Sequence, residues 1–298
     1  MNATTDVQGD GGLELALREA RRKQHESEAL LRAAKAIPLA ETFAQSARVI
    51  FDACKEVTGA TAGYVALLSA TGEENEVLFL DAGGLPCTVD PGLPMPIRGL
   101  RGVSYETNKA VYDNDFSHSH WMKFMPEGHV DLRNVMFSPV VVAGKTVGLI
   151  GLSNKDGDFT AADAEVATTF GELAAVALRF ARYQDELGRW AHVFEHADWG
   201  VAVVDPDNAS LNMINPAFAA MHGYRVEELM SKPLAMIWAP AERDALRGHL
   251  ALMRGQDHYN FESEHQRKDG SLFPVFVDVT AVEERIADES GGHEPKEG

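Results

Sequence analysis

The sequence has very little cysteine and no long apolar run. Its 298 residues include two cysteines, Cys54 and Cys87, which are too few for a disulfide framework and are typical of a reducing cytoplasm. The longest apolar stretches, such as 140–143 and 147–152, have the length of a strand. They fall far short of the roughly 18 apolar residues that cross a bilayer, so we expect no membrane span. The N-terminal residues are polar and acidic, unlike a signal peptide, and we expect a cytoplasmic location.

Positive charge is also scarce. The chain has 27 Lys and Arg against 45 Asp and Glu, which gives a formal net charge of −18. A field of that sign repels nucleic acid and anionic lipid, so we expect neither a nucleic-acid nor a membrane partner. A hydrophobic content of 45% is ordinary for a folded protein, and the length predicts two domains.

The sequence has no recognisable catalytic frame. No Ser/His/Asp or Cys/His arrangement stands in a motif such as G-x-S-x-G. A phosphoacceptor helix, an ATP-binding glycine-rich box, a GGDEF-like motif and a helix-turn-helix are likewise not recognisable. We therefore expect no enzyme activity from this chain and no catalytic residues.

Hydrophobic periodicity outlines a first domain over 38–184, after a disordered start and an N-terminal helix within 1–37. The expected elements are helices over 13–35 and 40–58, a hairpin over 63–70 and 76–84, an irregular excursion over 85–134 with a short helix at 104–109, a hairpin over 134–155, and a helix over 163–184. So long an excursion inside a compact domain is usually functional.

A heptad pattern predicts a helical linker over 173–198. Its apolar seam steps by four and three residues and consists of Leu173, Ala177, Phe180, Gln184, Leu187, Ala191 and Phe194. This spacing favours a coiled coil, and through it a homodimer. The alternative is that its first half is simply the packing helix of the first domain.

A second domain is predicted over 199–285, followed by a disordered tail over 286–298. Alternating strands are expected over 200–205 and 210–215, then short helices, then strands over 258–270 and 271–284. The last two strands meet at Asp269-Gly270, which is a hairpin signal.

Residues 199–284 resemble a PAS domain. The motifs that carry the resemblance are Asn215-Pro-Ala-Phe218, Gly223-Tyr224, Glu227-Glu-Leu229, and Arg267-Lys-Asp-Gly-Ser271 followed by Phe273-Pro274. They occur in the order and spacing of the family. A PAS sheet normally has five strands, and no strand is evident after Val282, so the last strand is expected to be missing.

Residues 38–184 resemble a GAF domain. The tract 147–152 is similar to the family's penultimate strand, and Asn154-Lys155, Phe159 and Asp163 resemble the "N-K … F-x-x-x-D-E" signature of its nucleotide-binding members. Here Ala164 follows the aspartate and the acid comes one residue later. The signature therefore does not establish nucleotide binding.

Together the two resemblances imply an α+β fold with two domains, each a mainly antiparallel sheet flanked by helices, joined by a long helix. They imply a signal-sensing module of two-component-type signalling, which binds a small ligand or partner and acts on an output domain or partner protein. Two alternatives stay open. The chain is a ligand-free dimerisation scaffold, or it is the sensory part of a histidine kinase whose catalytic region lies outside these residues.

In the first domain, we expect the excursion to form a ligand pocket, because aromatic side chains on a loop beside a sheet are typical of small-molecule sites. The expected contacts are Trp121, His129 and Asn134. The same aromatics could instead anchor the loop. The metal-ligand chemistry of this segment is carried by Asp113, Asp115, His118, His120 and His129, but their spacing does not favour a site and we expect no metal. Cys87 lacks the motif that accompanies bilin attachment in some GAF relatives.

In the second domain, the residues expected near a cavity are Trp199, Asn215, Phe218, Trp238 and Phe276. Haem-binding PAS relatives carry a histidine where this chain has Asp244, and His249 lies more than a turn later, so we expect no haem. A flavin photoadduct needs a cysteine, and none follows Cys87. The identity of any cofactor stays open.

Overall fold

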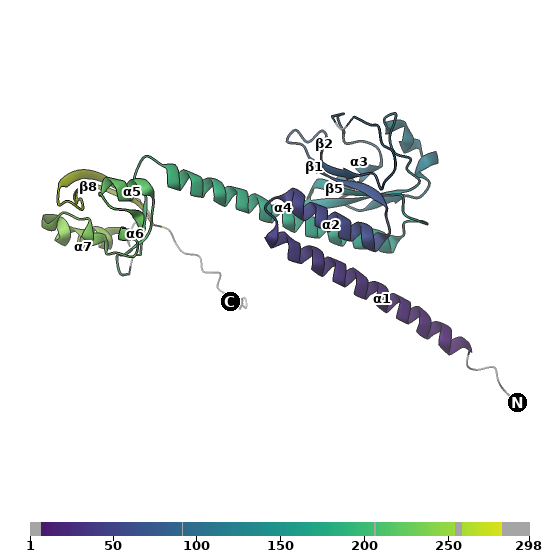
Figure 1. The fold of residues 1–298 in the computed structure, drawn as a ribbon, viewed down its shortest axis with the longest axis horizontal. Coiled ribbons are helices and arrows are strands. Elements are labelled where there is room, and N and C mark those ends of the chain that lie inside the picture. Colours follow the sequence, from purple (N-terminus) through teal and green to yellow (C-terminus); the bar gives the residue numbers. More distant parts are fainter. Residues whose placement is uncertain (1–6, 91, 206, 254–257, 282–298) are drawn as a thin grey trace, which may run out of the picture. The chain divides into compact units, whose positions relative to one another are not determined.

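The computed structural model describes residues 7–90, 92–205, 207–253 and 258–281, and it divides into two compact units, Met1–Asp185 and Glu186–Gly298 (Figure 1). Both combine helices with antiparallel strands, which confirms the predicted α+β class. Helix α1 (Val7–Ala36) corrects one expectation, because residues 7–12 are helical rather than disordered. The predicted tail over 286–298 lies outside the described residues.

A five-stranded antiparallel sheet forms the centre of the first unit, in the order β2-β1-β5-β4-β3. The strands are β1 (Ala62–Leu68), β2 (Asn75–Asp81), β3 (Val111–Asp113), β4 (Val135–Val142) and β5 (Lys145–Ser153). Both predicted hairpins are confirmed. The β4–β5 turn lies at Ala143 and Gly144, whose φ angles of 50° and 76° are those that a tight hairpin turn requires.

One face of this sheet packs against helices α2 (Phe43–Thr58) and α4 (Ala161–His196), and α1 packs against α2. Because alternate side chains of a strand face opposite sides, Val65, Met136 and Ile150 point into this core, where they meet Phe51 and Phe170. All five side chains are almost completely buried. Figure 1 shows α2 and α4 on one side of the sheet and α3 on the other.

The opposite face is covered by the excursion between β2 and β4. Its elements are α3 (Leu100–Thr107), β3, and the 3-10 turns η2 (Phe116–His118) and η3 (His120–Phe124). The short helix expected at 104–109 begins earlier and ends at Thr107, because Asn108 adopts a left-handed φ of 54°. Residues 111–113, expected to be irregular, supply the fifth strand.

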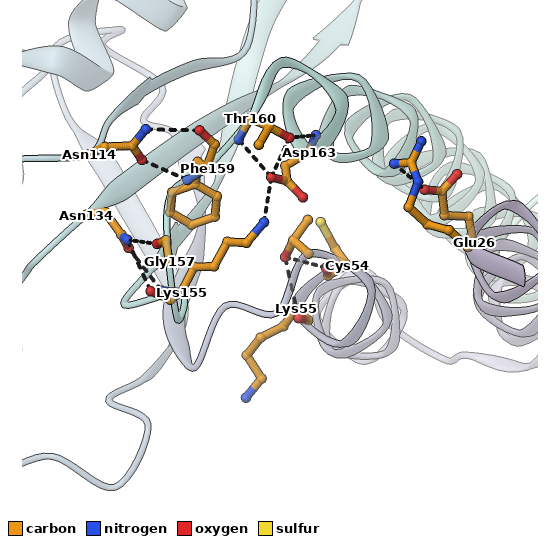
Figure 2. A network of polar contacts seen from close by, with 12 residues as sticks. Glu26, Cys54, Lys55, Asn114, Asn134, Lys155, Gly157, Phe159, Thr160 and Asp163 are labelled. Carbon is orange, nitrogen blue, oxygen red and sulfur yellow. Dashed lines mark hydrogen bonds and ion pairs between the residues drawn. The ribbon is translucent and has the colours of Figure 1, made fainter. Parts of the chain in front are cut away.

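A network of polar contacts holds the start of α4 (Figure 2). The Thr160 N–H donates to Asp163 Oδ2 at 2.7 Å, and the Asp163 N–H donates to Thr160 Oγ1 at 3.2 Å, which is a reciprocal helix cap. Lys155 Nζ donates to the same carboxylate at 2.6 Å, and the Asn114 amide bonds both backbone groups of Phe159. The residues of the Asn-Lys … Phe … Asp signature therefore brace the entry to the helix.

Helix α4 continues without a break to His196 and carries exposed apolar side chains from Val176 onward. Val176 and Tyr183 are 58% exposed, and Leu187 and Trp190 are 65% exposed. These four residues, which we call the α4 stripe, step by seven, four and three positions.

The first half of the predicted seam is packing surface of the first domain, as the alternative held. Ala177 is buried in the core of the first unit, and Leu173 and Phe180 pack against that core. The stripe shares only Leu187 with the predicted seam.

The second unit consists of short elements around its own core. They are β6 (Ala202–Val204), β7 (Leu211–Ile214), α5 (Pro216–Met221), α6 (Val226–Leu229), the 3-10 turns η4 (Leu234–Met236) and η5 (Pro240–Glu242), α7 (Arg243–Met253), β8 (His258–Gln266) and β9 (Leu272–Thr280). The predicted pairings of β6 with β7 and of β8 with β9 are confirmed. The expectation about a fifth strand concerns residues after 281, which lie outside the described part of the chain.

Candidate functional site

A pocket lies in the first unit between the sheet and the excursion that covers it. Its cavity volume is about 80 Å³, and part of the pocket is open to solvent. Its floor comes from β1, β4 and β5, and its walls come from the start of α3 and from η3 and the segment after it. Trp121 and His129 line it, as expected from the sequence. The excursion therefore covers a concave apolar surface on the sheet.

Aromatic rings form one wall of the pocket. The Trp121 and Phe124 rings are stacked with centroids 6.3 Å apart, and the Arg98 guanidinium lies 5.3 Å from the Phe124 centroid. Gly99 has a φ of 68°, and a Cβ there would lie 3.1 Å from the Phe124 ring. A glycine at this position therefore lets Phe124 lie against the chain.

A glycine on β5 keeps the floor of the pocket low. Gly151 pairs with Tyr64 across β5 and β1, and a Cβ on Gly151 would lie 2.6 Å from the Tyr64 ring. The Tyr64 ring can therefore rest on the sheet because Gly151 lacks a side chain. A Cβ on Gly63 would lie 2.1 Å from the Gly151 carbonyl oxygen and 2.9 Å from the Phe51 ring, so this glycine allows the close packing of the strand with the helix-side core.

Two polar side chains of the pocket were not anticipated from the sequence. Arg101, on the first turn of α3, is 7% exposed. The Tyr64 hydroxyl is buried without a hydrogen-bond partner in the described part of the chain. Burial raises the pKa of the Tyr64 hydroxyl, and the Arg101 guanidinium opposes that rise. The sequence signal for Arg101 is weak: it is one of two arginines, with Arg98, in the otherwise apolar and glycine-containing segment 93–102.

Asn134, the third residue expected at this pocket, does not line it. Its side chain donates to the carbonyl oxygens of Lys155 at 3.1 Å and Gly157 at 2.7 Å, and it accepts from the Lys155 N–H at 2.9 Å (Figure 2). These contacts use the whole amide group. Asn134 therefore ties the start of β4 to the loop that leads into α4.

The metal-ligand candidates of the excursion are dispersed over its surface. His118 and Asp115 form an ion pair of 2.6 Å in which both side chains are more than three-quarters exposed. The hydrogen bond that the His118 ring donates to the Asp115 carboxylate raises the pKa of His118. Among the described residues, no group of three metal-ligating side chains comes together.

The residues expected near a cavity in the second unit occupy three kinds of place. Phe218 and Trp238 are buried in the core. Asn215 is buried and caps α5, since its Oδ1 accepts from the Phe218 N–H at 2.9 Å. Trp199 and Phe276 lie at the surface, with 66% and 67% exposure. The structure therefore brings Asn215, Phe218 and Trp238 into the core but not the other two.

A buried histidine pair in the second unit was also missed. His222 and His265 are 0% and 5% exposed, and His222 Nε2 lies 2.9 Å from His265 Nδ1. Burial lowers the pKa of His222 and lowers that of His265 to about 4. The alternation of β8 could have predicted the burial of His265, because His265 lies on the same face of the strand as Phe261 and Ser263. His249, the haem-ligand alternative, stacks on Phe261 with ring centroids 3.8 Å apart.

Comparisons with known proteins match both halves of the chain. A model described as "GAF domain" matches residues 40–179, and one described as "PAS domain" matches residues 199–293. The chain carries a GAF domain followed by a PAS domain. Both are sensory rather than catalytic domains, so the pair supports a signal-sensing role.

Individual relatives match shorter parts. A sensor histidine kinase, TmoS of Ectopseudomonas mendocina, is 30% identical over 100 residues, which is 33% of this chain and only 10% of the kinase. The GAF domain from a phosphoenolpyruvate-protein phosphotransferase of Coxiella burnetii aligns with a TM-score of 0.48 and 17% identity, covering 55% of this chain and 98% of that one.

The PAS domain of an HTR-like protein from Haloarcula marismortui aligns with a TM-score of 0.31 and 22% identity, covering 34% of this chain and 82% of that one. None of the helices in the described part of the chain is both long and apolar enough for a membrane crossing.

Proposed function

We propose that this chain is the sensory part of a two-component-type signalling protein, in which the GAF pocket binds a small and largely apolar ligand. The observation that carries this proposal is the pocket itself, with its stacked Trp121 and Phe124 and a floor lowered by Gly151. Pockets with mainly apolar walls and a few polar groups are typical of small-molecule sites. The match to a sensor histidine kinase supports a kinase as the protein to which such a module contributes.

Transmission would run along α4, which begins in the GAF domain and ends beside the PAS core. The exposed α4 stripe supports self-association along this helix, because an unpartnered apolar stripe with heptad spacing is the usual seam of a coiled coil. A ligand would then favour one of two arrangements of the paired helices, with a coupling free energy of typically about 1–3 kcal/mol. In this way, a change in the arrangement of the α4 helices would transmit the effect of ligand binding from the GAF domain to the PAS domain and the output region.

Replacing Leu187 with aspartate is expected to weaken a dimer strongly, since it places a charge in the α4 stripe at a cost of several kcal/mol when desolvated. Light scattering over a range of protein concentrations measures the change in mass. The matched control is Arg189→Ala, which changes the charge equally on the face away from the stripe. A wild-type monomer, or a dimer that Leu187→Asp leaves intact, would contradict the stalk.

Replacing Trp121 with alanine is expected to weaken ligand binding by roughly tenfold, because it removes one aromatic wall of the pocket. N-phenyl-1-naphthylamine, a neutral apolar dye, measures the affinity by its fluorescence. Native mass spectrometry measures retention of any copurified small molecule. Trp199→Ala, a change at an exposed tryptophan of the PAS domain, should leave both values unchanged.

Equal binding by wild type and Trp121→Ala would show that the pocket is not the ligand site. Stoichiometric zinc or iron that is lost in His118→Ala would instead favour a metal site on the excursion.

A further inference from the structure

Arg101 is a buried cation without a counter-charge. Its side chain is 7% exposed, and among the ion pairs of the described residues none includes it. The electrostatic neighbours of its guanidinium are two neutral phenols, Tyr64 and Tyr105. Asp81 lies in the same pocket, but its carboxylate is already paired with Lys55 and Arg48. Because a buried charge without a partner is strongly unfavourable, the position calls for an anion.

The Tyr64 hydroxyl is a second donor beside Arg101, whose guanidinium acts on it directly. Its oxygen is buried and makes no hydrogen bond of normal geometry among the described residues. A buried hydroxyl in that state carries a desolvation cost, which a bound acceptor would remove. Tyr64 and Arg101 come from different elements, β1 and α3, and both line the pocket. Two neighbouring donors therefore lie on the lining of one apolar space.

The start of α3 adds to the positive potential at this end of the pocket. The helix begins after Gly99, which provides no side-chain cap, and Gly99, Leu100 and Arg101 all line the pocket. The first N–H groups of a helix carry partial positive charge and favour an anion. Trp121 and Phe124 supply a purely apolar wall. The pocket thus combines donors for an anion with a surface for an apolar body.

We propose that the GAF pocket takes a small apolar molecule that carries an anionic head group of the carboxylate type. The head group accepts hydrogen bonds from Arg101 and the Tyr64 hydroxyl, and the apolar body lies against Trp121 and Phe124. This inference rests on the proposed ligand-binding function of the pocket and assigns its ligand a chemical class. A guanidinium suits this role because its planar donors match both oxygens of a carboxylate.

Two probes of equal shape test the proposal. Isothermal titration of the full chain with 2-naphthoate and with 2-naphthamide compares an anionic and a neutral head group on one apolar body. The affinity of wild type for 2-naphthoate is expected to exceed its affinity for 2-naphthamide by roughly tenfold or more, because charge-assisted hydrogen bonds are stronger than neutral ones. In Arg101→Gln the preference should disappear while naphthamide still binds. Lys109→Gln is the matched control, since it removes an equal charge from an exposed side chain outside the pocket lining, and the preference should persist. Arg98→Gln tests separately whether the cation at the pocket rim contributes.

The outcomes separate this proposal from the proposed function. If neither probe binds to wild type, the ligand-binding pocket fails and this inference fails with it. If both probes bind equally, or if Arg101→Gln keeps the preference, the pocket stands and the anionic class is wrong. If Arg98→Gln removes the preference instead, the anion contacts the pocket rim and not Arg101, which also overturns the proposal.

The stability of the ligand-free protein provides a further readout. Removal of an unpartnered buried charge is expected to leave the thermal midpoint of Arg101→Gln unchanged or higher. In wild type, 2-naphthoate should raise the midpoint, and in the variant it should not. A marked drop in the midpoint of ligand-free Arg101→Gln would show that the guanidinium has a structural role, and this result would also overturn the proposal.

Discussion

Replacing Asn215 with alanine is expected to lower the free energy of unfolding of the PAS domain by about 3 kcal/mol or more, since an unsatisfied buried polar group costs ~1–3 kcal/mol. The Asn215 side chain is fully buried and makes four hydrogen bonds. Its Oδ1 accepts from the N–H groups of Val201 and Phe218, and its Nδ2 donates to the carbonyl oxygens of Phe194 and Trp199. Alanine would leave all four backbone groups without that partner.

One of these bonds joins the last turn of α4 to the PAS core, because Asn215 Nδ2 donates to the carbonyl oxygen of Phe194 in α4 while Asn215 caps α5. Loss of Asn215 should therefore also loosen the connection through which a signal would travel. Asn215→Asp is expected to have an intermediate effect, since a carboxylate keeps both acceptor contacts and loses both donor contacts.

Hydrogen exchange of the full chain measures this prediction domain by domain. Peptides that cover β6, β7 and α5 should lose protection in Asn215→Ala, whereas peptides that cover β4 and β5 of the GAF domain should not change. Asn212→Ala, a substitution at an exposed position of the neighbouring strand, is the matched control and should be neutral. Unchanged protection in Asn215→Ala would mean that the four hydrogen bonds contribute little to stability.

Acidification from about pH 6.5 to pH 4 is expected to destabilise the PAS domain through its histidine pair. Burial lowers the pKa of His265 to about 4 and also lowers that of His222. In this window the unfolded chain binds protons at these histidines and the folded chain does not, so the free energy of unfolding falls as the pH falls. For His265 alone, the loss is on the order of 3 kcal/mol by pH 4, since one pKa unit corresponds to ~1.4 kcal/mol.

The charged groups around the pair act in different directions. His222 lowers the pKa of His265, Glu242 raises it, and Arg267 lowers the pKa of His222. Glu242 accepts from the Ser263 hydroxyl at 2.6 Å, which lowers its own pKa from 4.5. The contribution of Glu242 to stability is therefore lost only below about pH 4.5, at the lower end of the histidine window.

Urea unfolding of the full chain between pH 4 and pH 7 measures the effect, and the transition that Asn215→Ala shifts identifies the PAS domain. His265→Gln removes one titrating group and keeps a donor for His222, so the slope of stability against pH should become much shallower. His258→Gln is the control at a half-exposed position of the same strand. An equal slope in wild type and His265→Gln would contradict this origin of the pH dependence.

The sequence was sufficient to predict a turn or a helix start wherever the residues that determine it are adjacent in the chain. A left-handed turn at Ala143-Gly144 and another at Gly270 set the pairing of their strands without help from distant residues. Asn215 followed by Pro216 predicts the start of α5, because the cap and the first helical residue are adjacent. Alternation and helical spacing predicted most of the remaining elements, and the family resemblances followed from short motifs.

Only the tertiary structure decided which polar side chains are buried. Arg101 and Tyr64 are far apart in the sequence and share one pocket because the excursion folds over the sheet. His222 and His265 meet because the β8–β9 hairpin lies against the end of α5, where the Lys268 N–H donates to the His222 carbonyl oxygen. Conversely, Trp199 and Phe276, which the sequence placed near a cavity, are exposed. Composition and spacing record the type of a side chain, whereas its burial and partners depend on the segments that pack against it.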